Sequence, residues 1–234
     1  MQQFPVIITV RDRVTPLKLL VEWLESVGQS NIWFCDNAST YPPLLEYLEN
    51  SRYNVVRNEL NLGHRGPWLS GLVAELGEDS AFVVTDPDVI PVETCPLDAL
   101  EHFNSVLQEY PEVDKVGFSL RIDDLPNHYA HRDDVILWES QFWKDKHPSG
   151  FYNAEIDTTF ALYRAGEGHQ NNRALRSPFP YTARHFPWYQ DSQSPTAEQV
   201  FYVDHADSLI INWDKQVLPA SLRAHLDNLR TSGI

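Results

Sequence analysis

The sequence is poor in cysteine and in basic residues, and it has no long apolar run. Its 234 residues include only two cysteines, Cys35 and Cys95, so we expect neither a disulfide framework nor a cysteine metal site. Lysine and arginine total 18 against 33 aspartates and glutamates, and the formal net charge of -15 repels a nucleic-acid backbone on average. The longest apolar stretches have the length of strands, and no basic and apolar leader precedes Phe4. We therefore expect one cytoplasmic domain with no integral membrane segment and no nucleic-acid partner.

Two common phosphate-binding signatures are also missing. The chain contains neither a Gly-x-Gly-x-x-Gly fingerprint nor a glycine-rich loop that ends in lysine, so kinase-like and dehydrogenase-like functions have no support. The segment from Arg11 to Thr15, which follows the first expected strand, has no glycine. This absence disfavours a nucleotidyltransferase, because such an enzyme cradles a nucleoside triphosphate on a glycine-rich loop.

The first half of the chain alternates short β-branched runs with helical patterns. We expect strands over residues 5–10, 31–35, 54–57 and 81–85, and helices over residues 16–27, 43–48 and 67–76. Thr15 is expected to cap the first helix and Gly28 to end it. This alternation predicts an α/β sandwich with a mainly parallel sheet, in which ligands bind beyond the carboxyl ends of the strands.

The second half of the chain is less regular. We expect helices over residues 96–110 and 134–143 and strands over residues 115–122 and 158–164. Residues 166–193 are rich in Gly, Asn, Pro and Arg, which predicts a long loop that could act as a lid. Thr196 and Gln199 form a capping-box pattern that predicts the start of a helix.

The segment Thr85-Asp86-Pro87-Asp88 ends the fourth expected strand with two carboxylates one residue apart. Alternate side chains of an extended chain share a face, so Asp86 and Asp88 can point at the same spot. Two carboxylates suit a hard divalent cation that keeps positions open for the phosphates of a substrate. An ordinary polar turn is the alternative, because Asp and Pro are common turn residues.

The order of these elements and motifs resembles the nucleotide-sugar-dependent glycosyltransferases of the GT-A fold, and in particular the family 2 type. The resemblance covers about the first hundred residues, in the segments from Val6 to Val10, Phe34 to Ser39, Asn58 to Gly66 and Thr85 to Pro91. It implies a Rossmann-like α/β/α sandwich in a single domain, with residues 1–110 binding the nucleotide sugar and residues 111–234 binding the acceptor. It also implies a Mn²⁺ or Mg²⁺ cofactor, a UDP- or GDP-sugar donor, and a glycan or other hydroxyl acceptor.

The resemblance also places donor-binding roles on matching positions. Asp36 would accept a hydrogen bond from the base, Arg65 would lie near the base or the phosphates, and Thr9 and Arg11 would line the nucleotide pocket. Asp86 would contact both the ribose and the metal, and Asp88 the metal. These roles agree with the chemistry of the side chains, because a carboxylate accepts hydrogen bonds from the N–H groups of a base and an arginine binds phosphate oxygens. A turn or capping role for Asp36 and an exposed ion pair for Arg11 are the alternatives.

An aromatic and basic segment from Tyr181 to Tyr189 contains His185 and Arg184. In many GT-A enzymes a late histidine completes the metal site, and His185 resembles that histidine in position. Arg184 would reach the diphosphate, and Trp188 is the aromatic residue that we expect on the acceptor side. A histidine that is packed in an aromatic cluster is the alternative.

Glu155 and Asp157, one residue apart before an expected strand, are the candidates for the catalytic base, with Asp157 preferred. Inverting transfer needs a carboxylate that takes the proton of the acceptor hydroxyl on the face opposite the nucleotide. The chain departs from the family 2 pattern after Tyr110, where no clear Glu-Asp pair is found. Two alternatives follow: acidic residues at a solvent-facing strand start, and a GT-A-like module that binds a nucleotide sugar or glycan without turnover.

Overall fold

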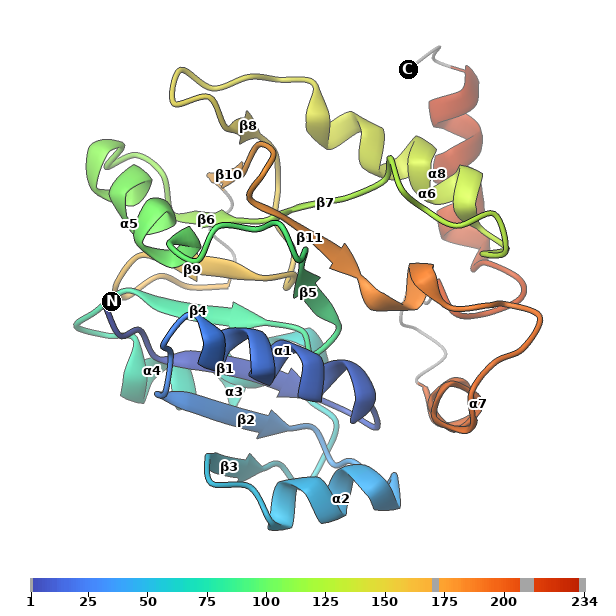
Figure 1. The fold of residues 1–234 in the computed structure, drawn as a ribbon, viewed down its shortest axis with the longest axis horizontal. Coiled ribbons are helices and arrows are strands. Elements are labelled where there is room, and N and C mark those ends of the chain that lie inside the picture. The colour runs from blue at the N-terminus through green and yellow to red at the C-terminus, as the bar shows by residue number, and fades with distance from the viewer. Residues whose placement is uncertain (1, 170–172, 207–212, 232–234) are drawn as a thin grey trace.

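The computed structural model describes residues 2–169, 173–206 and 213–231, and its centre is an eight-stranded mixed sheet (Figure 1). The strand order is β3-β2-β1-β4-β9-β6-β10-β8. The first four strands pair in parallel, and β9 runs antiparallel between β4 and β6. The strands are β1 (Val6–Val10), β2 (Ile32–Asp36), β3 (Asn54–Arg57), β4 (Phe82–Thr85), β6 (Lys115–Gly117), β8 (Tyr152–Asn153), β9 (Ala161–Tyr163) and β10 (Ala174–Arg176).

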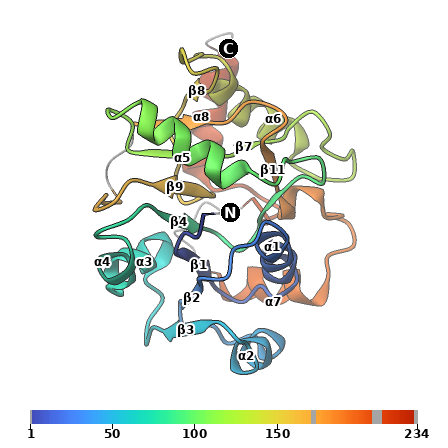
Figure 2. The same ribbon diagram turned by 60° about the vertical axis from the view of Figure 1, so that its left-hand side comes forward.

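Helices cover both faces of this sheet, as Figure 2 shows. On one face lie α1 (Thr15–Ser26), α2 (Pro42–Glu49) and α5 (Ala99–Glu109), and on the other lie α3 (Gly66–Leu69) and α4 (Leu72–Leu76). The alternation of β1 explains this arrangement, because Val6 and Ile8 join the first apolar core whereas Ile7 joins the second. All five residues of β1 are buried, as expected for a parallel strand that is covered on both sides.

The expected strand over residues 115–122 is in fact two strands in two different sheets. Residues of β6 belong to the large sheet, whereas β7 (Ser119–Leu120) pairs with β11 (Thr182–His185) in a small sheet of order β5-β11-β7. The third member, β5 (Val89–Pro91), begins directly after Asp88 and pairs antiparallel with β11. The small sheet therefore joins the Asp86-Pro87-Asp88 segment to residues almost a hundred positions later.

Two other expectations need correction. Residues 166–193 contain β10, β11 and a 3-10 helix, η3 (Phe186–Tyr189), rather than one long loop, because each short strand finds a neighbour to pair with. The expected helix over residues 67–76 is interrupted at Gly71, where a φ of 87° is incompatible with a continuous helix. It is preceded by a 3-10 turn, η1 (Gly63–Arg65).

The last third of the chain closes over one end of the sheet. The helices α6 (Arg132–Ser140) and α8 (Ala220–Thr231) pack together through a small apolar cluster, with η2 (Gln141–Trp143) after α6 (Figure 1). The helix α7 (Ala197–His205) begins at Thr196, whose hydroxyl accepts a hydrogen bond from the Gln199 N–H at 3.2 Å, as the capping-box pattern predicted. None of the helices in the described ranges is long and apolar enough to cross a bilayer.

The N-terminus of α1 is capped by a distant residue rather than by Thr15. The Glu198 carboxylate, from α7, accepts hydrogen bonds from the backbone N–H of Val14 at 3.0 Å and of Thr15 at 3.1 Å. It also accepts one from the Thr15 hydroxyl at 3.2 Å. A carboxylate suits this position because the first N–H groups of a helix are unpaired and carry the positive end of its dipole.

We expect Glu198→Ala to lower the free energy of unfolding by about 1 to 2 kcal/mol, the usual cost of removing an acceptor at a helix N-terminus. Urea unfolding followed by circular dichroism measures this loss. Glu46→Ala is the matched control, because Glu46 is exposed on α2, and it should change stability by less than about 0.5 kcal/mol. Equal effects of the two substitutions would contradict a specific capping role for Glu198.

Candidate active site

A cavity of about 1120 Å³ lies beyond the carboxyl ends of β1 and β4. Its walls come from both halves of the chain: the loops that follow β1, β3 and β4, the segment before β9, and residues of the last third. This is the place at which ligands bind in open α/β sheets. Nine residues selected from the sequence line it: Thr9, Arg11, Arg65, Asp86, Asp88, Glu155, Asp157, His185 and Trp188.

Three carboxylates converge in this cavity. Asp86 accepts a hydrogen bond from the Thr158 hydroxyl at 3.0 Å, and its N–H donates to the Thr158 carbonyl, which ties the end of β4 to the segment before β9. Burial raises the pKa of Asp86 well above its ordinary value, and the negative charges of Asp88 and Asp157 raise it further. Like charges held this close repel, and a bound cation would relieve the repulsion.

The second carboxylate of the triplet, Asp88, has two nitrogen neighbours. Arg13 Nη1 lies 3.3 Å from Asp88 Oδ2, and His185 Nε2 lies 3.7 Å from Asp88 Oδ1. Arg13 is also paired with Asp214 and stacks on Tyr202, with 3.8 Å from its Cζ to the ring centroid. These contacts attach the triplet to the first strand-helix loop and to the last third of the chain.

The position of His185 follows from the pairing of β11 with β5. His185 lies opposite Val89, and the Phe186 N–H donates to the Asp88 carbonyl at 2.8 Å. Burial lowers the pKa of His185, so the imidazole is held neutral even though the Asp88 and Asp214 carboxylates favour its charged form. A neutral imidazole and carboxylates are ligands that Mn²⁺ accepts, so Asp86, Asp88 and His185 suit a divalent metal by residue type. Their ligand atoms are not, however, among those of the described residues that lie within 4.8 Å of one another.

Several buried polar atoms around the cavity have no hydrogen-bond partner among the described residues. Among those of residues that line the cavity are Thr9 Oγ1, Arg13 Nε, Thr159 Oγ1, His185 Nδ1 and Trp188 Nε1. Buried polar groups are nearly always hydrogen-bonded in folded proteins, so a cluster of unsatisfied ones points to a missing polar partner. We interpret this cluster as the lining of a site for a polar ligand.

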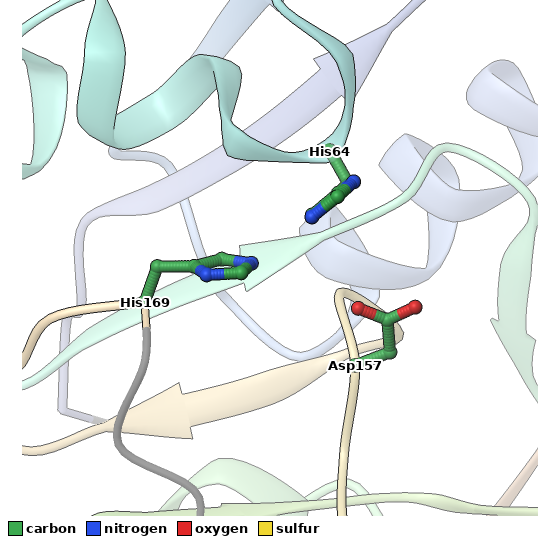
Figure 3. Close-up of side chains that lie close together, drawn as sticks. All are labelled: His64, Asp157 and His169. Atoms are coloured by element: carbon green, nitrogen blue, oxygen red, sulfur yellow. The ribbon is translucent and has the colours of Figure 1, made fainter. Parts of the chain in front are cut away.

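A second group of metal-binding side chains lies in the same cavity. His64, Asp157 and His169 each offer a ligand atom, and these atoms lie within 4.8 Å of one another (Figure 3). Burial lowers the pKa of His169, and the nearby His64 and Arg65 lower it further, so this imidazole is also held neutral. The three side chains can hold a cation, although the positive charge of Arg65 opposes one there, as that of Arg13 does beside Asp88.

Two residues selected from the sequence do not line the cavity. Asp36 is 1% exposed and accepts hydrogen bonds from the Ser39 N–H and from Arg57 Nε, each at 3.1 Å. These contacts are those of a turn residue, and they occupy the carboxylate that the resemblance assigns to the base.

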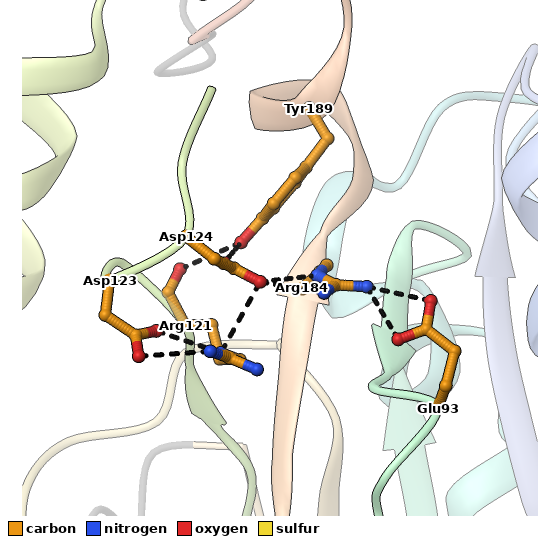
Figure 4. Close-up of polar contacts among 6 residues, drawn as sticks. All are labelled: Glu93, Arg121, Asp123, Asp124, Arg184 and Tyr189. Carbon is orange, nitrogen blue, oxygen red and sulfur yellow. Dashed lines mark hydrogen bonds and ion pairs between the residues drawn. The ribbon is translucent and has the colours of Figure 1, made fainter. Parts of the chain in front are cut away.

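Arg184 belongs to a polar network on another face of β11 (Figure 4). It donates to both Glu93 oxygens at 2.9 Å and to Asp124 at 2.7 Å, and the Tyr189 hydroxyl donates to the same Asp124 carboxylate. The reason is geometric, because neighbouring residues of a strand point to opposite faces and His185 faces the cavity.

Several lining residues were not selected from the sequence. Lys115 and Arg176 come from β6 and β10, Glu139 comes from α6, and the Arg176–Glu139 pair is 2.9 Å apart and buried. An isolated charged residue in a strand or helix gives no local signal, since its burial depends on how distant segments pack. His64 was not selected either, but it did have a local signal, because it directly precedes Arg65 in the turn that the resemblance marked.

Aromatic side chains form the wall of the cavity on the side of α6. Trp188 is 2% exposed, with its ring centroid 4.7 Å from that of His185 and 6.4 Å from that of Trp213. Trp138 and Phe142 continue this wall. Trp138, Phe142 and Trp213 are only half-buried, so their flat faces are the ones available to a sugar ring.

We expect Asp86→Asn to raise the free energy of unfolding at pH 7 in the absence of metal, because the amide carries no charge for Asp88 and Asp157 to repel. The folded-state pKa of Asp86 is raised, so the wild-type protein binds more protons folded than unfolded, and its stability falls as pH rises through that range. The advantage of the variant should therefore grow with pH and disappear in acid. Urea unfolding between about pH 4 and pH 8 measures it.

Asp114→Asn is the matched control with the opposite sign. Burial raises the pKa of Asp114, but hydrogen bonds from Arg173 lower it by more, so the net shift is downward. The stability that Asp114 contributes is present above its ordinary pKa and is lost as pH falls, so this variant should be less stable than the wild type at pH 7. Destabilisation at pH 7 by both substitutions would contradict the repulsion among the three carboxylates.

No protein-family model and no curated protein matches the chain. Among solved structures, it is similar to a mannosyltransferase from Pyrobaculum calidifontis in complex with GDP-mannose and Mn²⁺, with 13% identity and a TM-score of 0.51. That similarity covers 95% of this chain and 67% of the mannosyltransferase.

Two other solved structures are similar at lower scores. Glucosyl-3-phosphoglycerate synthase from Mycobacterium tuberculosis has 14% identity over 70% of this chain and a TM-score of 0.43, and the similar region spans only 57% of the synthase. A cytidylyltransferase from Leptospira borgpetersenii has 10% identity over 99% of this chain and 96% of its own, with a TM-score of 0.43. The similarity to the mannosyltransferase shows that the chain has a GT-A-type α/β fold, and the fold class expected from the sequence is confirmed.

Proposed function

We propose that this protein is a metal-dependent glycosyltransferase that moves a sugar from a UDP- or GDP-sugar to a hydroxyl group of a glycan or another acceptor. The observation that carries the proposal is the convergence of Asp86, Asp88 and Asp157 with the neutral His185 in a cavity at the carboxyl ends of parallel strands. Repulsion among these carboxylates destabilises the folded protein when no cation is bound, and a divalent cation would relieve it.

In this proposal, Asp86, Asp88 and His185 hold Mn²⁺ or Mg²⁺, which when bound neutralises the charge that develops on the departing diphosphate. Thr9, Arg11 and Arg65 line the cavity on the donor side. Arg11 is held there by the Asn37 carbonyl, to which its Nη1 donates at 2.6 Å. Arg13 keeps Asp88 in place through the 3.3 Å contact and adds a second positive charge near the diphosphate.

Asp157 is our candidate for the catalytic base, and Glu155 is the second choice. Both side chains are exposed to the cavity, one residue apart, and therefore on the same face of an extended segment. Thr158, the next residue, donates to Asp86, so the segment that carries the base is attached directly to the metal-binding end of β4. The aromatic wall of Trp138, Trp188 and Trp213 would hold the acceptor sugar.

In this proposal, the two halves of the single domain bind different substrates. Residues 1–110 provide most of the donor side, and residues 111–234 provide the base segment, the aromatic wall and His185. A cavity lined by both halves supports this assignment.

The alternative is a GT-A-like module that binds a nucleotide sugar or a glycan without turnover, since no Glu-Asp pair marks the base. A nucleotidyltransferase is disfavoured because the loop that follows β1 has no glycine with which to cradle a triphosphate.

We expect one nucleoside diphosphate, UDP or GDP, to raise the melting temperature only when Mn²⁺ is present. A ligand at about a hundredfold excess over its Kd stabilises the folded state by about 2.7 kcal/mol. Asp88→Ala should abolish the metal-dependent rise, whereas Asp79→Ala, at an exposed position away from the cavity, should keep it. Absence of a response to every nucleotide under every metal would refute a donor site in this chain.

We expect the wild-type protein to hydrolyse its nucleotide sugar slowly in the presence of metal, because water can replace the acceptor. Asp157→Asn should reduce this rate by about 10² or more, the usual contribution of a general base, whereas Glu155→Gln should change it much less. Release of nucleoside diphosphate measures the rate, and nucleotide-induced stabilisation of each variant checks that the donor site is intact. Binding without any hydrolysis by the wild type would favour the non-catalytic module.

A further inference from the structure

Lys115 is a buried basic residue without a counterion. It is 2% exposed, yet it lines the cavity, and its Nζ lies 5.1 Å from the centroid of the Tyr163 ring. Among the described residues, no carboxylate lies within ion-pairing distance of this ammonium and no oxygen accepts a hydrogen bond from it. Buried charges in proteins are normally paired, so an unpaired one that opens on a cavity points to a partner that binds from outside.

The position of Lys115 is fixed by the centre of the sheet rather than by a flexible loop. Its strand, β6, lies between β9 and β10, and Lys115 is paired with Tyr163 on one side and with Ala174 on the other. Val116, the next residue, joins the apolar core on the opposite face. The alternation of the strand therefore directs the Lys115 side chain to the cavity face, and the chain cannot turn it to solvent without breaking the sheet.

The arginines of the cavity, unlike Lys115, have a protein partner or are exposed to water. Arg176 is paired with Glu139, Arg13 with Asp88 and Asp214, and Arg11 with backbone carbonyls. Arg65 has no such partner in the described part of the chain, but it is exposed to water at the cavity rim. Lys115 alone in this set is both buried and unpaired.

The nearest acidic groups do not form an ion pair with Lys115. Asp114, the preceding residue, is occupied by Arg173, whose Nε and Nη2 lie 3.1 and 2.5 Å from its oxygens. Asp157 and Glu155 influence Lys115 only from a longer range. Burial lowers the pKa of Lys115, and these carboxylates offset that lowering only in part, without taking up its three hydrogen-bond donors.

We propose that Lys115 is an oxyanion-binding residue and that the part of the cavity around it takes a phosphate or carboxylate group of a substrate. An ammonium is a compact point charge with three donors, and a phosphate oxygen satisfies both its charge and its hydrogen bonds. The oxyanion belongs either to the donor or to an acceptor that is itself anionic. The assignment to a transferase substrate rests on the function proposed above, whereas the binding of an oxyanion at Lys115 does not.

The test uses inorganic phosphate as the probe and isothermal titration calorimetry at neutral pH without metal. Lys115→Met keeps the size and apolar stem of the side chain and removes its charge, and we expect it to weaken phosphate binding at least tenfold. Lys144→Met, at an exposed lysine, is the matched control and should bind phosphate as the wild type does. Lys115→Arg keeps the charge and should retain binding, which also separates loss of the charge from a folding defect.

A repeat of the titration in the presence of Mn²⁺ and a saturating nucleoside diphosphate separates the two sources of the oxyanion. Phosphate binding that persists and still depends on Lys115 assigns the site to an anionic acceptor. Phosphate that is displaced assigns the site to the donor. Phosphate binding that is absent from the wild type, or equal in the wild type and Lys115→Met, overturns the proposal.

These outcomes differ from those that concern the proposed function. A chain that binds phosphate through Lys115 but responds to no nucleotide would retain the oxyanion site and lose the glycosyltransferase proposal. A chain that responds to a nucleotide with metal but binds phosphate independently of Lys115 would retain the glycosyltransferase proposal and lose the oxyanion site at Lys115.

Discussion

The crowding of negative charge at the carboxyl end of β4 is the constraint on which the rest of the site depends. Asp86 and Asp88 lie one residue apart, and burial together with the charges of Asp88 and Asp157 raises the pKa of Asp86. The surrounding structure offsets this crowding with Arg13 and with the Thr158 hydroxyl, both of which come from other segments. Although the chain carries a net charge of -15, five of its basic residues line this cavity: Arg11, Arg13, Arg65, Lys115 and Arg176.

The C-terminal third holds the first strand-helix loop in place. Glu198 caps α1, Tyr202 stacks under Arg13, and Asp214 pairs with the same arginine. Arg11 adds a bond to the His205 carbonyl at 3.4 Å. The loop that follows β1 is therefore held by contacts from α7 and from Asp214, so this wall of the cavity depends on residues that lie about 190 positions later in the chain.

The sequence was informative where structure is local. The first four strands and the capping of α7 were predicted closely, because β-branched runs and capping pairs act over a few residues. β10 and β11 were missed because strands of three and four residues in a segment rich in Arg and Pro depend on pairing with distant neighbours. The Asp86–Asp88 pair was visible as one motif, whereas Lys115 resembles an ordinary surface lysine until β9 and β10 enclose it. Adjacent residues of any strand point to opposite faces, so assigning Arg184 and His185 to a strand is enough to separate their roles.

The short ladder between β5 and β11 has a further consequence for how the sequence of such a protein can vary. It joins Asp88 to His185 through three residue pairs, so the distance between carboxylate and imidazole is set by strand register and not by the roughly ninety intervening residues. Insertions in that long connection leave the register unchanged. A single residue gained or lost within β5 or β11 shifts the ladder by one, and His185 then points away from Asp88. Length variation in related chains should therefore avoid these two short strands and accumulate elsewhere.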